Sequence, residues 1–209
     1  MERFDYFVSS VYTENCQTFL KTMSEVSDGY NLSVKDQMYQ SDNFAYDIRA
    51  QEFANHVAQN AWDILNSQGY AMHRLETRLN ELWLQVYSKY DYMPQHIHSG
   101  YSHISGFYFL EVPENSGRII AFDPRAGKNQ INLPERNKEE VTHASDMVNF
   151  EPYPGLLLMT NSWLPHALVG HMTDERMKVL HFNITVKDYI PDRKSTRLNS
   201  SHIPLSRMP

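Results

Sequence analysis

Two histidines separated by one residue, His96 and His98, have the spacing in this 209-residue chain that points most directly to chemistry. On an extended strand, residues two apart project from the same face, with Cα atoms roughly 6.6 Å apart. The pair fits a polar strand edge, and it also fits two imidazoles that meet one metal ion. His166, at the end of the apolar segment LLLMTNSWLPH, is the candidate third ligand. Two close ligands and one remote ligand leave positions open for substrate and oxygen, as non-haem iron catalysis requires.

Further motifs surround these histidines in a fixed order. HIHSGYSHISGFYFLEVPENSGRIIAFDPR begins at His96, and EPYPGLLLMTNSWLPHALVGHMTDERMKVLHFNITV begins at Glu151. Over about residues 82–186 the sequence resembles the 2-oxoglutarate and iron(II)-dependent oxygenases known from phage and bacterial genomes. Those proteins show His-x-His, SGxYYL, a DPR turn and PxxGxLxxxxSWLxH, followed by a basic residue and FN. The resemblance implies a dioxygenase, most simply a hydroxylase of an unknown substrate, that uses Fe(II), 2-oxoglutarate and O2.

The resemblance also implies a ligand set, in which His96, His98 and His166 hold the iron. The wider superfamily usually has His-x-Asp at the first pair. His98 would therefore replace a carboxylate, so that three neutral ligands leave the metal more positive. Asp91 and Asp123 are alternative sources of the carboxylate, although neither has the usual spacing.

The co-substrate needs its own anchor, because its carboxylate far from iron requires a fixed cation, best supplied by a guanidinium. Arg176, ten residues after His166, resembles the superfamily's position for this group, and Lys178 is the reserve candidate on the same strand face. Tyr108 would either donate a hydroxyl to the same carboxylate or pack in the core. Asn183 would hydrogen-bond near the metal or cap a strand.

Four further histidines, His103, His143, His171 and His181, are not expected to bind the metal. His103 follows a glycine turn, and His181 lies in a predicted strand, where a buried and hydrogen-bonded histidine is the commoner case. His143 and His171 show no spacing that suits a shared metal ion.

The elements that position these residues follow from the apolar period. Apolar residues at i, i+3, i+4 and i+7 from Cys16 predict a short helix with Thr13 as its cap, and the same spacing from Phe53 predicts a longer helix that ends near Gly69. From Glu81 the period changes to two, which predicts strands. Further predicted strands are Ile104–Val112, Arg118–Phe122, Gly155–Thr160 and Lys178–Val186.

Helices followed by short strands predict an α+β chain. The resemblance implies that the strands form a double-stranded β-helix, a cupin-like jelly roll of about residues 82–186 with N-terminal supporting helices. We expect residues 1–191 to form a single domain. From Asp192 the chain reads DRKSTRLNSSH, which is the translation of a common sequencing-library adapter, so residues 192–209 are expected to be an artefactual tail.

Composition excludes several classes of protein. A formal net charge of −6 argues against a nucleic-acid partner. No apolar run approaches the roughly 18 to 20 residues that span a bilayer, and the first ten residues do not resemble a signal peptide. We therefore expect a cytoplasmic protein, in the host cytoplasm if it is viral. The single cysteine, Cys16, excludes an internal disulfide and a cysteine-based zinc finger.

Two other functions fit the same residues. A jelly-roll binding or structural viral protein would keep the fold without turnover. A cupin-type metalloenzyme would use three histidines without 2-oxoglutarate, and the position of Arg176 relative to the metal distinguishes it from an oxygenase.

Overall fold

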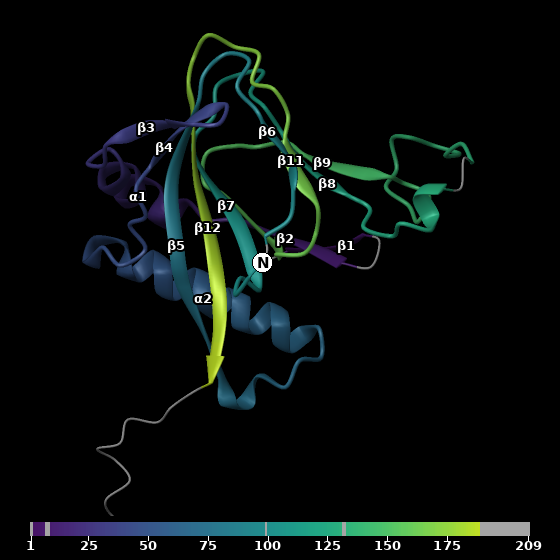
Figure 1. Cartoon of the computed structure of the whole chain (residues 1–209), viewed down its shortest axis with the longest axis horizontal. Coiled ribbons are helices and arrows are strands. Elements are labelled where there is room, and N and C mark those ends of the chain that lie inside the picture. Colours follow the sequence, from purple (N-terminus) through teal and green to yellow (C-terminus); the bar gives the residue numbers. More distant parts are fainter. Residues whose placement is uncertain (1, 7–8, 99, 131–132, 189–209) are drawn as a thin grey trace, which may run out of the picture.

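The computed structural model describes residues 2–6, 9–98, 100–130 and 133–188 (Figure 1). They form two antiparallel β-sheets, two α-helices and several short 3-10 turns. The α+β prediction is confirmed. The predicted tail, residues 192–209, lies outside the described residues. None of the helices described here is long and apolar enough to cross a membrane.

The larger sheet has the strand order β1-β2-β10-β7-β12-β5-β4-β3. Its strands are β1 (Glu2–Tyr6), β2 (Ser9–Asn15), β3 (Leu32–Lys35), β4 (Met38–Ser41), β5 (Leu75–Tyr87), β7 (Ile104–Glu111), β10 (Leu156–Asn161) and β12 (Met177–Asp188). The smaller sheet has the order β6-β11-β8-β9, with β6 (Met93–His96), β8 (Ile119–Phe122), β9 (Met147–Phe150) and β11 (His166–Leu168).

The strands at the centre of the larger sheet are buried on both faces. In β7, Phe107 and Phe109 pack toward the smaller sheet, whereas Tyr108 and Leu110 pack toward the helices. Because side chains alternate along a strand, β12 is divided in the same way: its odd-numbered residues face the smaller sheet. This division decides which side chains reach the space between the two sheets.

Helices α1 (Leu20–Ser27) and α2 (Gln51–Ser67) lie on the outer face of the larger sheet (Figure 1). The apolar stripe of α2 is buried as predicted, and Gly69, just beyond its end, has a φ of +94°. The prediction for the first helix is wrong at its start. Thr13 pairs within β2, and a 3-10 turn (Gln17–Phe19) precedes α1, so Thr13 caps no helix.

The N-terminal region also contributes strands that the periodicity did not indicate. β1 and β2 extend one edge of the larger sheet, and β3 and β4 extend the other. β3 is only four residues long and is exposed along its whole length. β5 begins at Leu75, before the predicted change of period at Glu81. The order of helices first and strands afterwards was therefore wrong for this region.

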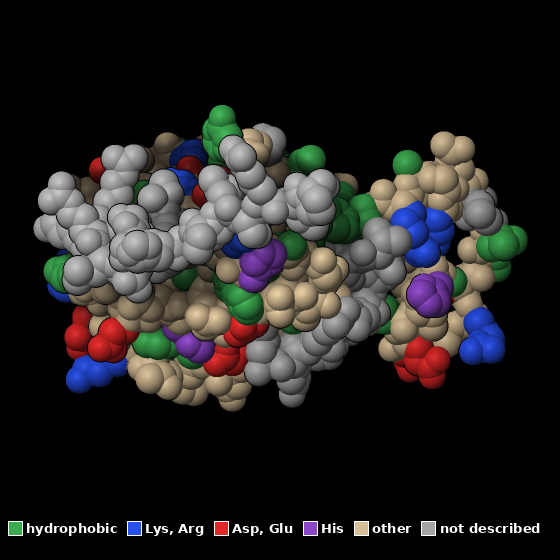
Figure 2. All heavy atoms as spheres, turned by 90° about the horizontal axis from the view of Figure 1, so that it is seen from below, with side chains coloured by type: hydrophobic (Ala, Val, Ile, Leu, Met, Phe, Trp, Pro, Cys, Tyr) green, Lys and Arg blue, Asp and Glu red, His purple; other side chains and the backbone are tan. Residues whose placement is uncertain are grey.

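The connection between β8 and β9 extends away from the two sheets (Figure 1). It begins with the DPR turn, where the buried carboxylate of Asp123 pairs with Arg125 at 2.7 Å. Figure 2 shows this lobe at the right, with basic and acidic side chains beside one another. The turn therefore anchors the lobe through a buried ion pair.

Candidate metal centre

Sheet register brings two of the predicted histidines together. His96 at the end of β6 is the direct antiparallel partner of His166 at the start of β11. Cross-strand partners on one face have Cβ atoms about 4.5–5.5 Å apart. Accordingly, the centroids of the two rings are 4.6 Å apart.

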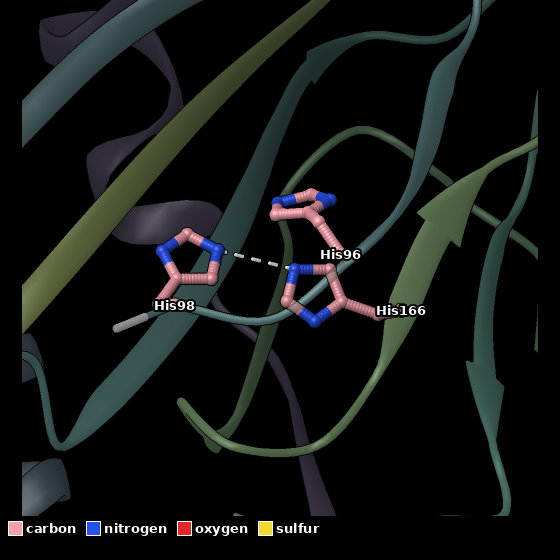
Figure 3. Close-up of side chains that lie close together, drawn as sticks. All are labelled: His96, His98 and His166. Atoms are coloured by element: carbon pink, nitrogen blue, oxygen red, sulfur yellow. Dashed lines mark hydrogen bonds between the residues drawn. The ribbon is translucent and has the colours of Figure 1, made fainter.

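His98 joins this pair from the segment that follows β6. Its backbone N–H donates to the carbonyl of Ser162 at 2.8 Å, which ties the segment to the chain just before β11. The ring of His98 stacks against that of His166, with centroids 5.1 Å apart. Figure 3 shows the three imidazoles turned toward one another.

The ring nitrogens are oriented for a shared cation. The Nε2 atoms of His98 and His166 are 3.3 Å apart, and one nitrogen from each of the three rings lies within 4.8 Å of the others. The Nδ1–H groups of His96 and His166 donate to the carbonyls of Pro94 and Leu164, each at 2.9 Å. Because Nδ1 carries the proton in these two rings, the Nε2 lone pair is left for a metal.

Burial keeps the rings of His98 and His166 uncharged. Loss of solvent, with the neighbouring His96 as a second cause, lowers the pKa of His98 to about 4 and that of His166 to about 3. Metal binding requires neutral imidazole. The site is therefore in its metal-binding protonation state at neutral pH without having to lose a proton from these two rings.

No carboxylate joins the histidines among the residues that the structure describes. Asp91 accepts a hydrogen bond from the backbone N–H of Ser88 at 2.7 Å, and Asp123 is paired with Arg125. Both alternative sources of a carboxylate are thus engaged elsewhere. Three imidazoles are a donor set that suits iron as well as zinc, copper and nickel.

A cavity of about 320 Å³, called here the histidine cavity, opens beside these rings. Its wall combines residues of both sheets, among them Lys35, Gln40, Gln85, His98, His181 and Asn183. Lys35 is the one lysine or arginine among the described residues that line it. The Lys35 ammonium lies 5.7 Å from the centroid of the Trp83 ring.

His181 contributes an unsatisfied polar atom to this wall. The ring is buried and stacks on Phe107, with centroids 4.4 Å apart, and its Nε2 has no hydrogen-bond partner in the described structure. Burial lowers the pKa of His181 far below its usual range, so the ring is neutral. A buried polar atom without a partner normally marks a missing polar occupant. The cavity therefore fits a polar ligand.

The structure does not bring the predicted co-substrate anchors to the cavity. Arg176 is exposed and lies over the Tyr39 ring, 5.8 Å from its centroid. Lys178 is on the helix-facing side of β12, where it pairs with Asp28 and Glu111, each at 2.9 Å. Lys178 is an even-numbered residue of β12, and the even-numbered residues of this strand point away from the histidines.

Tyr108 also lies on the helix side, where its hydroxyl donates to the Cys16 carbonyl at 2.6 Å. Tyr108 therefore packs in the core, which is the second of its two predicted alternatives. Asn183, by contrast, lines the histidine cavity, and its amide donates to Glu81 at 2.7 Å. The alternation in β12 also places His181 at this site.

Two features of the site were missed. Lys35 is the last residue of β3, a short exposed strand that the sequence analysis did not predict. His181 shares its strand face with Asn183, and that parity was the available signal.

A second cavity, of about 310 Å³, lies on another side of His98. Tyr70 and Trp163 line it and are 55% and 42% exposed, so aromatic surface is presented at the opening. This space is called here the Trp163 cavity. His98 lines both cavities and connects the cluster to each of them.

Residues 81–183 match the protein family described as "Putative 2OG-Fe(II) oxygenase". The match spans 103 of the 209 residues and identifies a 2OG-Fe(II) oxygenase segment that carries His96, His98 and His166. Its cofactors are accordingly Fe(II) and 2-oxoglutarate, and O2 is its oxidant. No curated protein matches the sequence significantly.

Solved structures with the same fold include several oxygenases. An oxidoreductase of the 2OG-Fe(II) oxygenase family from Burkholderia pseudomallei is 10% identical, with a TM-score of 0.58 and 84% of each chain covered. A prolyl-4-hydroxylase from Pseudomonas putida is 11% identical, with a TM-score of 0.57, 85% of this chain and 93% of that chain covered. The viral collagen prolyl hydroxylase of Paramecium Bursaria Chlorella virus-1, solved with 2OG, is 11% identical, with a TM-score of 0.54 and coverage of 84% and 94%. The predicted double-stranded β-helix is confirmed.

Proposed function

We propose that this oxygenase is a hydroxylase in which His96, His98 and His166 hold Fe(II). The convergence of the three imidazoles, two of them with Nδ1–H bound to a carbonyl, carries the proposal. When bound, the iron supplies oxidation of a substrate by O2, coupled to conversion of 2-oxoglutarate to succinate and CO2. The protein binds the reactants, orients them and excludes water.

The histidine cavity is the proposed place for 2-oxoglutarate. A carboxylate removed from water costs several kcal/mol unless it is paired. Lys35 is the proposed partner of the carboxylate far from the metal, because it is the one lysine or arginine in the described cavity wall, which also includes Asp36. The Gln40 and Gln85 side chains, joined by a 3.0 Å hydrogen bond, add amide groups to the same wall.

The Trp163 cavity is the proposed entrance for the substrate. It shares His98 with the first cavity, so a ligand in it approaches the metal from a different side. Exposed Tyr70 and Trp163 favour a substrate that presents an apolar or planar group.

An anaerobic titration tests the iron and co-substrate assignment. We expect Fe(II) with 2-oxoglutarate to give the visible charge-transfer band of a chelate complex, and Fe(II) alone to give none. His166→Ala should abolish the band, whereas His143→Ala, on the exposed lobe, should leave it unchanged. A band of normal intensity in His166→Ala would overturn the ligand assignment.

A second experiment tests the anchor through succinate formation uncoupled from any substrate. Lys35→Met should raise the KM for 2-oxoglutarate at least about tenfold, or roughly 1.4 kcal/mol, and leave iron affinity unchanged. Arg176→Met is the matched control and should have no effect. If only Arg176→Met raised the KM for 2-oxoglutarate, Arg176 would be the co-substrate anchor, as predicted from the sequence. Turnover that never depends on 2-oxoglutarate would favour a three-histidine enzyme without it.

A further inference from the structure

A second cluster of metal-ligating side chains lies on the helix side of the larger sheet. Glu14 is in β2, Cys16 follows the end of that strand, and His56 is on α2. Glu14 and Cys16 are two residues apart, on the same face as Tyr12, which packs into the helix-side core. The carboxylate oxygen, the sulfur and a ring nitrogen all lie within 4.8 Å of one another.

The distances within this cluster match the edges of a tetrahedral site. The Nε2 atom of His56 is 3.1 Å from Glu14 Oε2 and 3.8 Å from Cys16 Sγ. Zinc bonds of about 2.0–2.1 Å to N and O and about 2.3 Å to S imply edges of roughly 3.3 Å for N to O and roughly 3.6 Å for S to N. The two N–O and S–N separations each differ from these edges by about 0.2 Å, and the sulfur and the carboxylate oxygen lie within 4.8 Å of one another.

Hydrogen bonds also join these side chains in the absence of a metal. Asn60, one turn along α2 from His56, places its amide nitrogen 3.1 Å from His56 Nε2 and 3.0 Å from Glu14 Oε2. The same Nε2 thus faces a carboxylate, an amide N–H and a sulfur, although one imidazole nitrogen makes a single in-plane hydrogen bond. It donates to Glu14 in one tautomer, in which Asn60 donates to the same carboxylate oxygen, and it accepts from Asn60 in the other. A cation bound to the Nε2 lone pair would also engage the carboxylate and the sulfur.

We propose that Glu14, Cys16 and His56 form a second metal site, for a thiolate-binding divalent cation of the Zn²⁺ type. The donor set of sulfur, imidazole and carboxylate is one that zinc prefers. The Cys16 residue is only 5% exposed, whereas the side chains of Glu14 and His56 are 23% and 29% exposed, which leaves the fourth position to water. The bound ion joins the end of β2 to α2, on the opposite face of the sheet from the three-histidine cluster.

Cobalt titration of the full-length, chelator-treated protein tests this site separately from the proposed iron site. Cys16 is the only cysteine of the chain, so a thiolate-to-cobalt charge-transfer band in the near ultraviolet can arise only from it. We expect two Co²⁺ per chain, one of them with this band. His98→Ala should lose the Co²⁺ ion that gives no thiolate band. Cys16→Ser should lose the Co²⁺ ion that gives this band.

His56→Gln guards against a folding defect of Cys16→Ser, because His56 is partly exposed on a helix surface. His56→Gln should weaken binding of the Co²⁺ ion that gives the band at least about tenfold, and it should leave the affinity for the other Co²⁺ ion unchanged. Zn²⁺ should also raise the melting temperature of His98→Ala, and not that of the double variant with His56→Gln, because binding to the folded state stabilises it by mass action. Absence of the band in the wild-type protein, or a band unaffected by His56→Gln, would overturn the proposal. Either result leaves the proposed iron site untouched.

Discussion

His166 shows how one residue is prepared for metal binding before any metal arrives. It is 1% exposed, its Nδ1–H donates to the Leu164 carbonyl, and burial lowers its pKa to about 3. Ring orientation, tautomer and charge state are therefore all set by the protein. Because the buried ring is neutral, it takes up a proton when the chain unfolds in acid, and this proton uptake favours the unfolded state.

This cost predicts the pH dependence of stability in the metal-free protein. The pKa values of His98 and His166 are about 4 and about 3 in the folded chain and about 6.5 in the unfolded chain. Between these values the unfolded state binds more protons, so the free energy of unfolding should fall as the pH drops below about 6.5 toward 4. Urea unfolding across that range measures it.

The control for this effect is a histidine in a different environment. His166→Gln removes a titrating group and should flatten the dependence, whereas His73→Gln, at an exposed position, should leave it unchanged. If the free energy of unfolding changed with pH equally in the wild type and in His166→Gln, the acid sensitivity would not arise from the three-histidine cluster.

At the scale of elements, strands β7 and β12 position the site. Their close approach requires a glycine in β7. A Cβ added at Gly106 would lie 2.4 Å from Cζ of Phe182 and 2.6 Å from the Leu158 carbonyl oxygen. The second contact is with backbone, which cannot rotate away. Neighbouring Ser105 is fully buried in the same strand. The SG pair thus allows β7 to pack tightly between its two neighbouring strands.

We therefore expect Gly106→Ala to destabilise the protein by roughly 1–3 kcal/mol through overpacking. Gly127→Ala is the matched control, because a Cβ there meets nothing within 4 Å, and it should change stability by less than about 0.5 kcal/mol. Chemical denaturation of both variants measures the difference. Similar stabilities for the two would show that β7 shifts freely, contrary to the packing described here.

At the scale of the whole molecule, the fold is held by two cores on either side of the larger sheet. The last strand, β12, is paired to its end, where Asp188 lies opposite Leu75. The sheets that carry both cavities are thus complete by residue 188.

Removal of residues 192–209 should therefore leave the melting temperature and turnover unchanged. The resemblance of this segment to a translated adapter predicts that no selection for packing or catalysis shaped it. Thermal unfolding and uncoupled succinate formation of a chain ending at Pro191 measure this. A fall in either would show that the segment contributes to the protein.

The sequence by itself determined the three histidines, the strands that carry most of the core and the longer helix. His96 and His98 were predictable because side-chain direction along a strand is a local property, and α2 because its apolar stripe is strictly periodic. Local spacing also predicted Arg176 and Lys178 at the site, whereas in the structure Lys178 lies on the helix-facing side of β12 and Arg176 lies over the Tyr39 ring.

Only the tertiary structure decided what surrounds the histidines. Strand pairing set His166 opposite His96, and the exposed hairpin of β3 and β4 brought Lys35 to the cavity wall. The cluster of Glu14, Cys16 and His56 joins residues 40 positions apart. Such contacts depend on which edges and faces meet after folding, and a local period in the sequence carries no information about that.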